Sequence, residues 1–320
     1  MANAKIFYGT STTGLLGDGV RLDHMISLEI NRLLTDTSNL RNSIYLTYAG
    51  SINGVGSDTI RIRKYGLGGR DSFSAATSEN SDESGNYTDI DAEYADVQVA
   101  RQYLIRNISD LASMSGFGSG DLNPFVLAAD MALSYETRFA AMQCDAADSF
   151  STTVGSSSDV MSVDLFFEAI SDLQVADSNR GADGPFAMVL HPKALNELQD
   201  SLRNETSNAV SMMQATAEML EIKGKGYVGK LFGVDIYRSS HVTTGSGALN
   251  NYILSPGALA YADGIPNQLP SAVDFMTMGK ILVEMERTGM SAVTNIIGHA
   301  YLGFSILDDD RGVVVKTSAS

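Results

Sequence analysis

The chain has 320 residues, of which 44% are hydrophobic and 19% are charged, so it can form a substantial core and is not expected to be disordered. At ~100–200 residues per domain, this length allows two or three domains. The net charge of −16 argues against a general nucleic-acid-binding surface, which needs Lys and Arg to neutralise phosphates. Such acidity either aids solubility or prevents a negatively charged polymer, such as a nucleic acid, from binding to the protein surface.

The cysteine content and the lack of long apolar stretches argue against a disulfide-stabilised protein and a membrane-spanning protein. Cys144 is the only cysteine, so no intramolecular disulfide can form, and its apolar helical surroundings predict a buried, unreactive thiol. No apolar stretch reaches the ~18 residues that indicate a membrane-spanning helix. The N-terminal residues also lack the apolar core of a signal peptide. We therefore expect neither a membrane span nor a secretion signal.

The first segment of the chain predicts an arm and a helix. Residues 1–20 are rich in Gly and Thr, which is typical of an extended arm. Apolar residues at helical spacing predict a helix over residues 23–35. A short strand, Ile44 to Tyr48, and a Gly-rich turn follow.

Residues 58–107 predict a long β-hairpin. Thr59–Tyr65 alternates apolar and charged residues, and the run from Tyr94 to Ile105 indicates a second strand. Between them, Gly66–Asp89 is rich in Gly, Ser, Asn and acidic residues and has little to bury. The charged strands offer little apolar surface to their own domain, and a lone hairpin is marginally stable in water. A neighbouring subunit is the expected support, and a mobile surface hairpin or a disordered insert is the alternative.

A long helix is expected after this hairpin. Residues 115–121 are a Gly–Ser hinge, and Asn123 followed by Pro124 is a helix start with Asn as N-cap. The helix is expected to run to about Ala147, a length of ~36 Å that suits a structural spine. One apolar face recurs at three- and four-residue spacing: Ala128, Met131, Tyr135, Phe139, Met142 and Ala146.

Alternating helix and strand patterns over residues 160–270 predict a compact α/β domain. The expected helices lie at 163–173, 192–202 and 209–222, and the expected strands at 185–190, 231–237 and 252–254. The first helix is expected to bury Val163, Phe166, Phe167, Ile170 and Leu173. Strand patterns at 281–286, 300–307 and 313–316 are expected to form a second domain with the long helix.

One segment has the spacing of a phosphate-binding loop. Gly224–Lys230 matches G-x-G-x-x-G and nearly matches the phosphate loop, but Leu231 stands where that loop needs a hydroxyl for magnesium. Both motifs also require a strand before the loop and a helix after it, the reverse of the pattern here. We interpret the segment as a basic loop, with a nucleotide-binding α/β enzyme that uses loop 224–230 as an alternative.

No motif predicts catalysis, a cofactor or a bound metal. The four histidines share no ligand spacing with Cys or acidic residues, so we expect no enzyme. Basic residues on the hairpin would suit docking onto an acidic neighbour, although single exposed ion pairs contribute little. Three acids beside Arg311 indicate a solvated turn or an intersubunit ion pair, with a cation site as the less favoured alternative. The candidate intersubunit residues are Arg61, Arg63, Lys64, Arg70, Arg101, Asp308, Asp309, Asp310 and Arg311.

The order of elements and three short segments resemble a known family. Phe186–Leu195 contains MVLHPK at a strand–helix junction, Gly229–Tyr237 followed by Ser239 reads G-x-L-x-G-x-x-V/I, and Tyr252–Tyr261 is also similar. These features resemble the major capsid proteins of tailed bacteriophages with the Hong Kong 97-type fold. The resemblance implies an α+β fold with an N-terminal arm, an extended β-hairpin loop, a peripheral domain with a long spine helix and a β-sheet, and an α/β axial domain.

The resemblance also implies domain boundaries. The N-terminal arm and helix would occupy residues 1–57, and the extended loop, lying over an adjacent subunit, residues 58–107. The peripheral domain with its spine helix would comprise 108–159 and 275–320, and the axial domain 160–274. Some relatives form a Lys–Asn cross-link, which is not expected here because Lys64 lies on the hairpin arm rather than clearly at its tip.

The implied function is that of a major capsid protein that self-assembles into pentamers and hexamers of an icosahedral phage head around double-stranded DNA. Implied partners are other copies, scaffold and portal proteins, potential cement or decoration proteins, and packaged DNA bound without sequence specificity. The implied location is the virion capsid, assembled in the host cytoplasm without a membrane. An encapsulin-like compartment shell protein is the alternative within the same fold.

Overall fold

The computed structural model describes residues 45–53, 56–65, 92–109, 124–176, 184–204, 213–214, 226–264, 275–278 and 281–320. Strands in these segments form a six-stranded, an eight-stranded and a two-stranded sheet, accompanied by long helices, so the predicted α+β class is confirmed. The expected arm, the helix over 23–35, the hairpin tip with Arg70, and the hinge at 115–121 lie outside the described residues.

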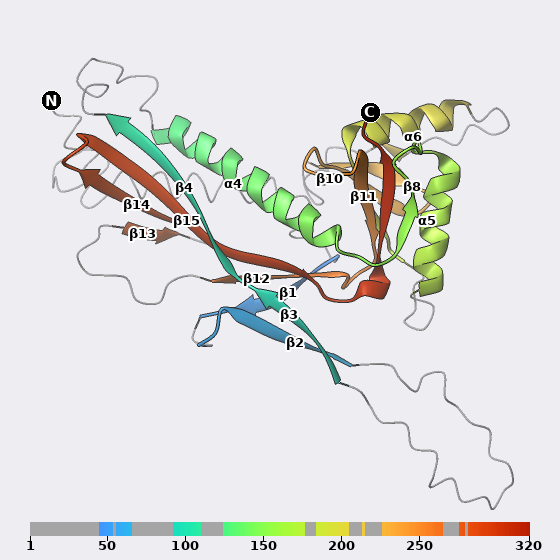
Figure 1. The fold of residues 1–320 in the computed structure, drawn as a ribbon, viewed down its shortest axis with the longest axis horizontal. Helices are drawn as coiled ribbons and strands as arrows, with labels where there is room; N and C mark the ends of the chain where they lie inside the picture. Colours follow the sequence, from blue (N-terminus) through green and yellow to red (C-terminus); the bar gives the residue numbers. More distant parts are fainter. Residues whose placement is uncertain are drawn as a thin grey trace, which may run out of the picture.

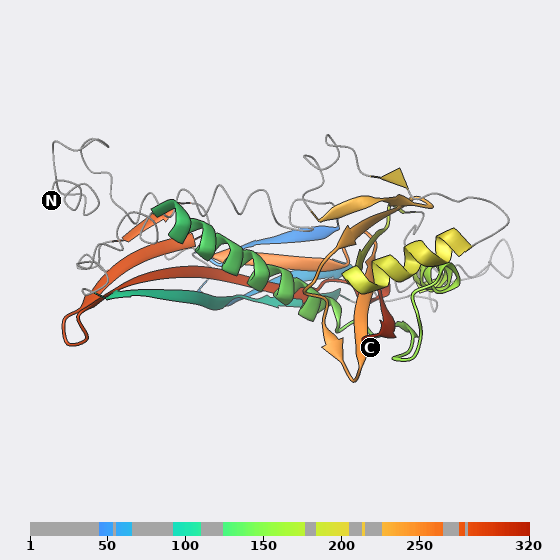
Figure 2. The same ribbon diagram turned by 90° about the horizontal axis from the view of Figure 1, so that it is seen from above.

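The six-stranded sheet is built on one long strand, β15, which pairs with three others. Its strands are β1 (Leu46–Ser51), β12 (Leu259–Gly264), β15 (Val293–Ile306), β14 (Ile281–Thr288), β13 (Phe275–Met278) and β4 (Ala100–Ser109). The first half of β15 lies between β14 and β4, and its second half pairs with β12. Figures 1 and 2 show this sheet as the elongated half of the molecule.

Helix α4 (Pro124–Ala147) has the bounds expected from its Pro start and apolar spacing. It lies along one face of the six-stranded sheet (Figure 1). Met131 and Tyr135 are buried there against Gly298, where a Cβ would lie 2.8 Å from Met131 Cε and would overlap the Tyr135 hydroxyl. Glycine at this position therefore allows the helix to approach β15 closely.

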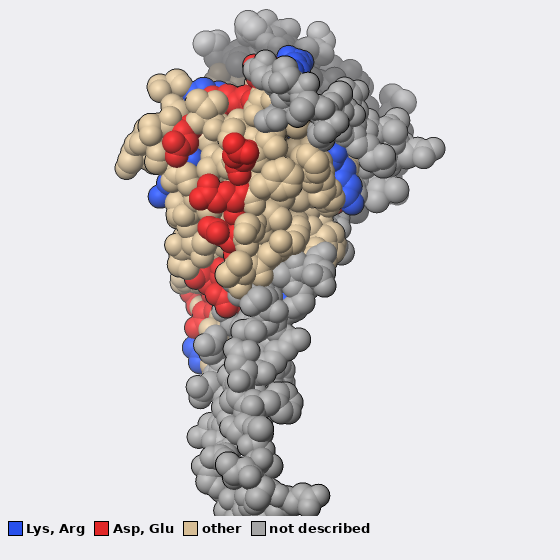
Figure 3. All heavy atoms as spheres, turned by 90° about the vertical axis from the view of Figure 1, so that its right-hand side faces the viewer, with Lys and Arg blue, Asp and Glu red and all other residues tan. Residues whose placement is uncertain are grey.

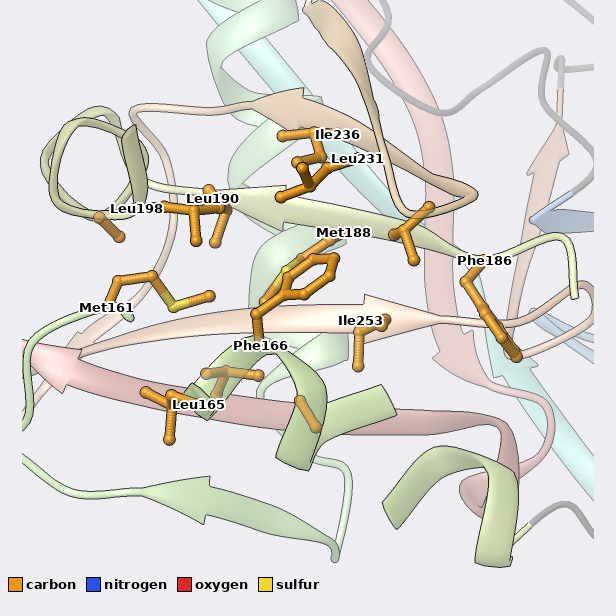
Figure 4. Packing of buried hydrophobic residues seen from close by; sticks show 14 of the residues in the cluster. Met161, Leu165, Phe166, Phe186, Met188, Leu190, Leu198, Leu231, Ile236 and Ile253 are labelled. Atoms are coloured by element: carbon orange, nitrogen blue, oxygen red, sulfur yellow. The ribbon is translucent and has the colours of Figure 1, made fainter. Parts of the chain in front are cut away.

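The eight-stranded sheet carries two helices on one face. In order, its strands are β5 (Thr153–Gly155), β16 (Gly312–Ser318), β11 (Ala248–Leu254), β6 (Ala187–Leu190), β9 (Val234–Arg238), β8 (Tyr227–Leu231) and β7 (Met213–Gln214), with β10 (Thr244–Gly245) beside β11. Helices α5 (Val163–Ala176) and α6 (Pro192–Asn204) bury Phe166 and Leu198 against Met188, Leu190 and Ile253 (Figure 4).

A second apolar cluster lies on the other side of the eight-stranded sheet and joins it to the six-stranded sheet. Tyr252 of β11 and Ala147 of α4 are buried in it together with Leu46 and Leu259, which belong to β1 and β12. Because strands of both sheets contribute to one cluster, the two sheets are held in a fixed relation.

A buried carboxylate ties the segment before β1 to the same cluster. The Tyr45 hydroxyl lies 3.0 Å from Asp235 Oδ2 and 3.2 Å from the Phe186 carbonyl, and Tyr227 donates to Asp235 Oδ1 at 3.5 Å. Burial, and then Asp235, raise the pKa of Tyr45 well above its usual value. Tyr45 therefore stays a neutral hydrogen-bond donor to the buried acid.

One predicted helix is wrong in its described residues, and one predicted strand is divided by a turn. Within the range predicted as a helix at 209–222, Met213–Gln214 is an edge strand that pairs with β8, and its other residues are outside the described part. The predicted strand at 231–237 is the end of β8, a turn at Phe232–Gly233 and strand β9. Both turn residues have positive φ, 47° and 89°, as a tight two-residue hairpin requires.

Three strands pair with segments from other expected domains, while the domain boundaries themselves stay a prediction. Strand β12, from the range expected to be axial, and β1, from the N-terminal segment, pair in the six-stranded sheet. Strand β16, from the range expected to be peripheral, pairs with β11 and β5 in the eight-stranded sheet. These pairings join residues that are distant in sequence, so they cannot be predicted from local sequence patterns.

We predict that Gly298→Ala destabilises the chain by ~1–3 kcal/mol, because the added methyl group overpacks the contact between α4 and β15. Urea unfolding measures the change. Gly289→Ala is the matched control, because a Cβ at that exposed turn has no atom within 4 Å. Equal midpoints for the two variants would contradict the close helix–sheet contact.

Candidate assembly surface

The β2–β3 hairpin is the most distinctive projection of the described chain. Strands β2 (Thr59–Tyr65) and β3 (Ala92–Gln98) pair antiparallel, from Thr59 opposite Gln98 to Tyr65 opposite Ala92. The hairpin predicted from alternation is confirmed for these arms. The second predicted strand, however, divides near Val99, and its continuation as β4 pairs with β15 instead. The chain therefore runs directly from the hairpin into the six-stranded sheet (Figure 1).

The inner face of the hairpin packs on its own chain. Val97 is completely buried, and Val99 nearly so, in a cluster with Ala260 and Ala262 of β12; Ile60 and Ile62 pack against this cluster. The expectation that these strands have little apolar surface for their own domain is wrong for the described arms. Strict alternation places their apolar side chains on one face, where together they form a continuous contact.

The outer face of the hairpin carries arginines and a tyrosine. Arg61 forms a two-point ion pair with Asp96, with Nε–Oδ1 at 2.8 Å and Nη2–Oδ2 at 2.9 Å, which lowers the pKa of Asp96. Arg63 donates to the Tyr94 hydroxyl at 3.2 Å, and both guanidinium groups lie within 6 Å of the Tyr94 ring centroid. The arginines hold Tyr94 in place while 49% of its surface stays exposed.

A second Arg–Tyr pair follows on β4. The Arg101 guanidinium lies 5.1 Å from the Tyr103 ring centroid, and Tyr103 is 61% exposed. We call Arg61, Arg63, Tyr94, Arg101 and Tyr103 the Arg–Tyr surface. Arg and Tyr are both enriched in protein–protein interfaces. Of the other predicted contact residues here, Lys64 lies in β2 opposite Glu93, and Arg70 is outside the described residues.

The acidic turn at 308–311 makes contacts within its own chain. Arg311 lies 3.3 Å from Asp308 Oδ2 and donates to the Pro256 carbonyl at 2.6 Å. Asp309 accepts a hydrogen bond from the Ser151 amide at 2.9 Å, whereas Asp310 is exposed. The turn thus supports the junction between β15 and β16. An intersubunit role for these residues stays a prediction, and Asp310 is the most accessible of them.

The segment discounted as a phosphate loop is largely a strand. Gly229 and Lys230 lie within β8, between β9 and β7, so their backbone groups belong to a sheet rather than to a loop before a helix. Cys144 is buried as expected, and burial raises the pKa of its thiol to about 11. Across the described ranges there is no group of three or more potential metal ligands. No helix in them is long and apolar enough to cross a membrane.

The sequence analysis did not identify two exposed aromatic residues. Phe167 was expected on the buried face of α5, yet 44% of its surface is exposed. It lies beside Phe232 of the β8–β9 turn, which is 47% exposed, with ring centroids 4.8 Å apart. The fully buried residues Phe166, Ala169 and Leu173 define the inward direction of the helix and leave Phe167 at its edge.

Comparison with known proteins identifies the fold. No protein-family profile matches the chain, and no curated protein is similar to it in sequence. The mature capsid of bacteriophage PhiM1 (TM-score 0.57, 13% identity) covers 89% of this chain and 88% of its own. The match to the capsid of Ralstonia phage GP4 has a TM-score of 0.57 at 11% identity and covers 89% of this chain and 90% of that one. The match to the SrpI encapsulin of Synechococcus elongatus has a TM-score of 0.51 at 11% identity and covers 81% of each chain. The predicted capsid fold is confirmed.

We predict that Val97→Thr destabilises the hairpin base by ~1–3 kcal/mol, because it places a hydroxyl group in an apolar cluster. Hydrogen exchange of the amides in β2 and β3 should accelerate. Ile105→Thr, at a 45% exposed apolar residue of β4, is the control and should leave exchange in β2 and β3 unchanged. Equal exchange rates in both variants would show that the inner face does not anchor the hairpin.

Proposed function

We propose that this chain, which has the fold of phage capsid proteins, is a major capsid protein that assembles into the icosahedral head of a tailed bacteriophage. One observation carries the proposal beyond the fold. The β2–β3 hairpin is anchored at its base by Val97 and Val99, yet its far end projects away from both sheets and presents the half-exposed Tyr94, held by Arg61 and Arg63. A fixed projection with this composition suits contact with a second copy.

In the proposed shell, each copy uses different surfaces toward its neighbours, because a closed ring needs heterologous contacts. The far part of the extended loop at 58–107 would lie on an adjacent subunit, while its base stays on its own chain. The six-stranded sheet with α4 would serve as the peripheral domain, and the eight-stranded sheet with α5 and α6 as the axial domain in rings of five and six. Under this proposal, β1 and β12 join the peripheral part and β16 joins the axial part.

The charge of the chain fits a container for DNA rather than a DNA-binding protein. The net charge of −16 disfavours adhesion of packaged double-stranded DNA, so the DNA would be enclosed without sequence-specific contacts. The proposed partners are other copies of the chain, scaffold and portal proteins, and potential cement proteins. The proposed location is the virion, after assembly in the host cytoplasm, and the proposed role is structural rather than catalytic.

An encapsulin-like compartment shell is the second candidate, because a solved encapsulin shares the fold over 81% of this chain. The two candidates differ in what the particles contain. Particles isolated from the native source should hold long double-stranded DNA if the chain forms a phage head. Protein cargo without DNA would favour the compartment shell.

We predict that deletion of residues 66–90 leaves a soluble, folded subunit but abolishes or weakens closed shells, because the far part of the extended loop reaches a neighbour. Circular dichroism checks the fold, and electron microscopy of the expressed protein, alone and with a candidate scaffold, checks assembly. Arg203→Ala, which removes only an exposed ion pair with Asp200 on α6, is the control. Particles of normal size and stability from the deletion variant would contradict the role of the loop.

A further inference from the structure

An aromatic pair on the α/β half of the molecule lies at the edge of the core, with one side of each ring against the buried Phe166 and the other side exposed. Phe167 of α5 and Phe232 of the β8–β9 turn are 44% and 47% exposed, and their rings are 4.8 Å apart. The core beneath them is formed by Phe166 and Leu231, which are buried. Paired, half-exposed aromatic rings of this kind are typical anchors of protein–protein interfaces.

The backbone at Phe232 strengthens this reading. Its φ of 47° lies in the left-handed region, and with Gly233 it forms a two-residue turn. Asn, Asp or Gly is favoured at such a position, and a bulky aromatic residue is strained there. Packing on Phe166, with ring centroids 6.4 Å apart, accounts for the inner side of the Phe232 ring. The other side stays exposed and is available for contact with another molecule.

The charges beside the pair indicate what that molecule carries. Every charged residue of α5 is acidic, and Asp164, Glu168 and Asp172 are spaced by four so that they form one ridge. Figure 3 shows acidic side chains gathered in a band on this end of the molecule. Like charges at this spacing weaken an isolated helix. A basic partner surface would relieve the repulsion.

The same chain supplies a surface of opposite charge. Strands β2 and β4 carry five basic residues and no acid, whereas β3 between them in sequence carries Glu93 and Asp96, so the three strands together have an excess of positive charge. Asp96 is already paired with Arg61, so the arginines of the Arg–Tyr surface considered for a contact with another copy are Arg63 and Arg101. Two copies facing each other through their acidic ridges would repel, so the contact must join different surfaces. A heterologous contact of this kind generates a closed ring when its rotation closes.

We propose that the Arg–Tyr surface of one copy docks onto the Phe167–Phe232 pair and the acidic ridge of α5 in a second copy. Tyr94 and Tyr103 would pack against the phenylalanine rings. Arg63 and Arg101 would pair with Glu168 and Asp172, while Arg61 keeps its own partner Asp96. The proposal rests on the proposed function, to which it adds a specific contact between neighbouring subunits. Aromatic packing would supply most of the affinity. Charge pairing would determine which surface of the neighbouring copy is bound.

The first test replaces Phe232 with Asn. Asn relieves the strain of the turn but removes the ring contacts with Phe166 and Phe167, so the melting temperature of the isolated subunit should stay close to that of the unmodified chain. Particle formation should require at least a tenfold higher protein concentration. Met290→Asn is the control, because Met290 is a fully exposed apolar residue in the β14–β15 turn. Assembly of Phe232→Asn at the same concentration as the control would overturn the proposal.

The second test reverses charges on both surfaces. The pair Glu168→Lys and Asp172→Lys, and the pair Arg63→Glu and Arg101→Glu, should each block particle formation, and the four changes combined in one chain should restore it. Electron microscopy and sedimentation provide the readout, with Asp200→Lys on α6 as the control. Absence of rescue, or normal particles from either pair alone, would refute this contact while the shell function stands. Absence of particles from the unmodified chain, with or without scaffold, would refute both proposals.

Discussion

The apolar cluster between the two sheets is the constraint on which the rest of the structure depends. It contains Ala147 at the end of α4, Tyr252 of β11 and Leu259 of β12, so one helix and both sheets share a single packed region. Close packing of this kind resists relative movement of its members. The bonds between Tyr45 and Asp235 attach the chain before β1 to the same region.

This constraint also fixes the direction of the hairpin. Strand β3 leads through Val99 into β4, and the inner face of the hairpin packs against Ala260 and Ala262 of β12, whose neighbour Leu259 belongs to the central cluster. The projecting arms are therefore part of the rigid body at their base. A hairpin positioned in this way loses less conformational entropy on docking than a flexible loop would.

Local chemistry explains why several elements were predictable from sequence. Helix α4 runs from Pro124 to Ala147 as expected, because proline at the first helical position and three- and four-residue apolar spacing both act within the helix itself. Strand β2 has its predicted bounds because alternation is a property of the single strand. The candidate surface was only partly predictable: Arg61, Arg63 and Arg101 were identified, but their tyrosine partners and the Phe167–Phe232 pair were not.

The sequence by itself determined the α+β class, the spine helix and the hairpin arms, because these follow from periodicity and composition along short segments. Only the tertiary structure decided which sheet receives β1, β12 and β16, that the hairpin base is buried on its own chain, and that Phe167 meets Phe232 at the surface. Those outcomes depend on contacts between residues far apart in the chain. Several strands have the same local pattern, and the register of the hydrogen bonds and the fit of the side chains decide which of them pair.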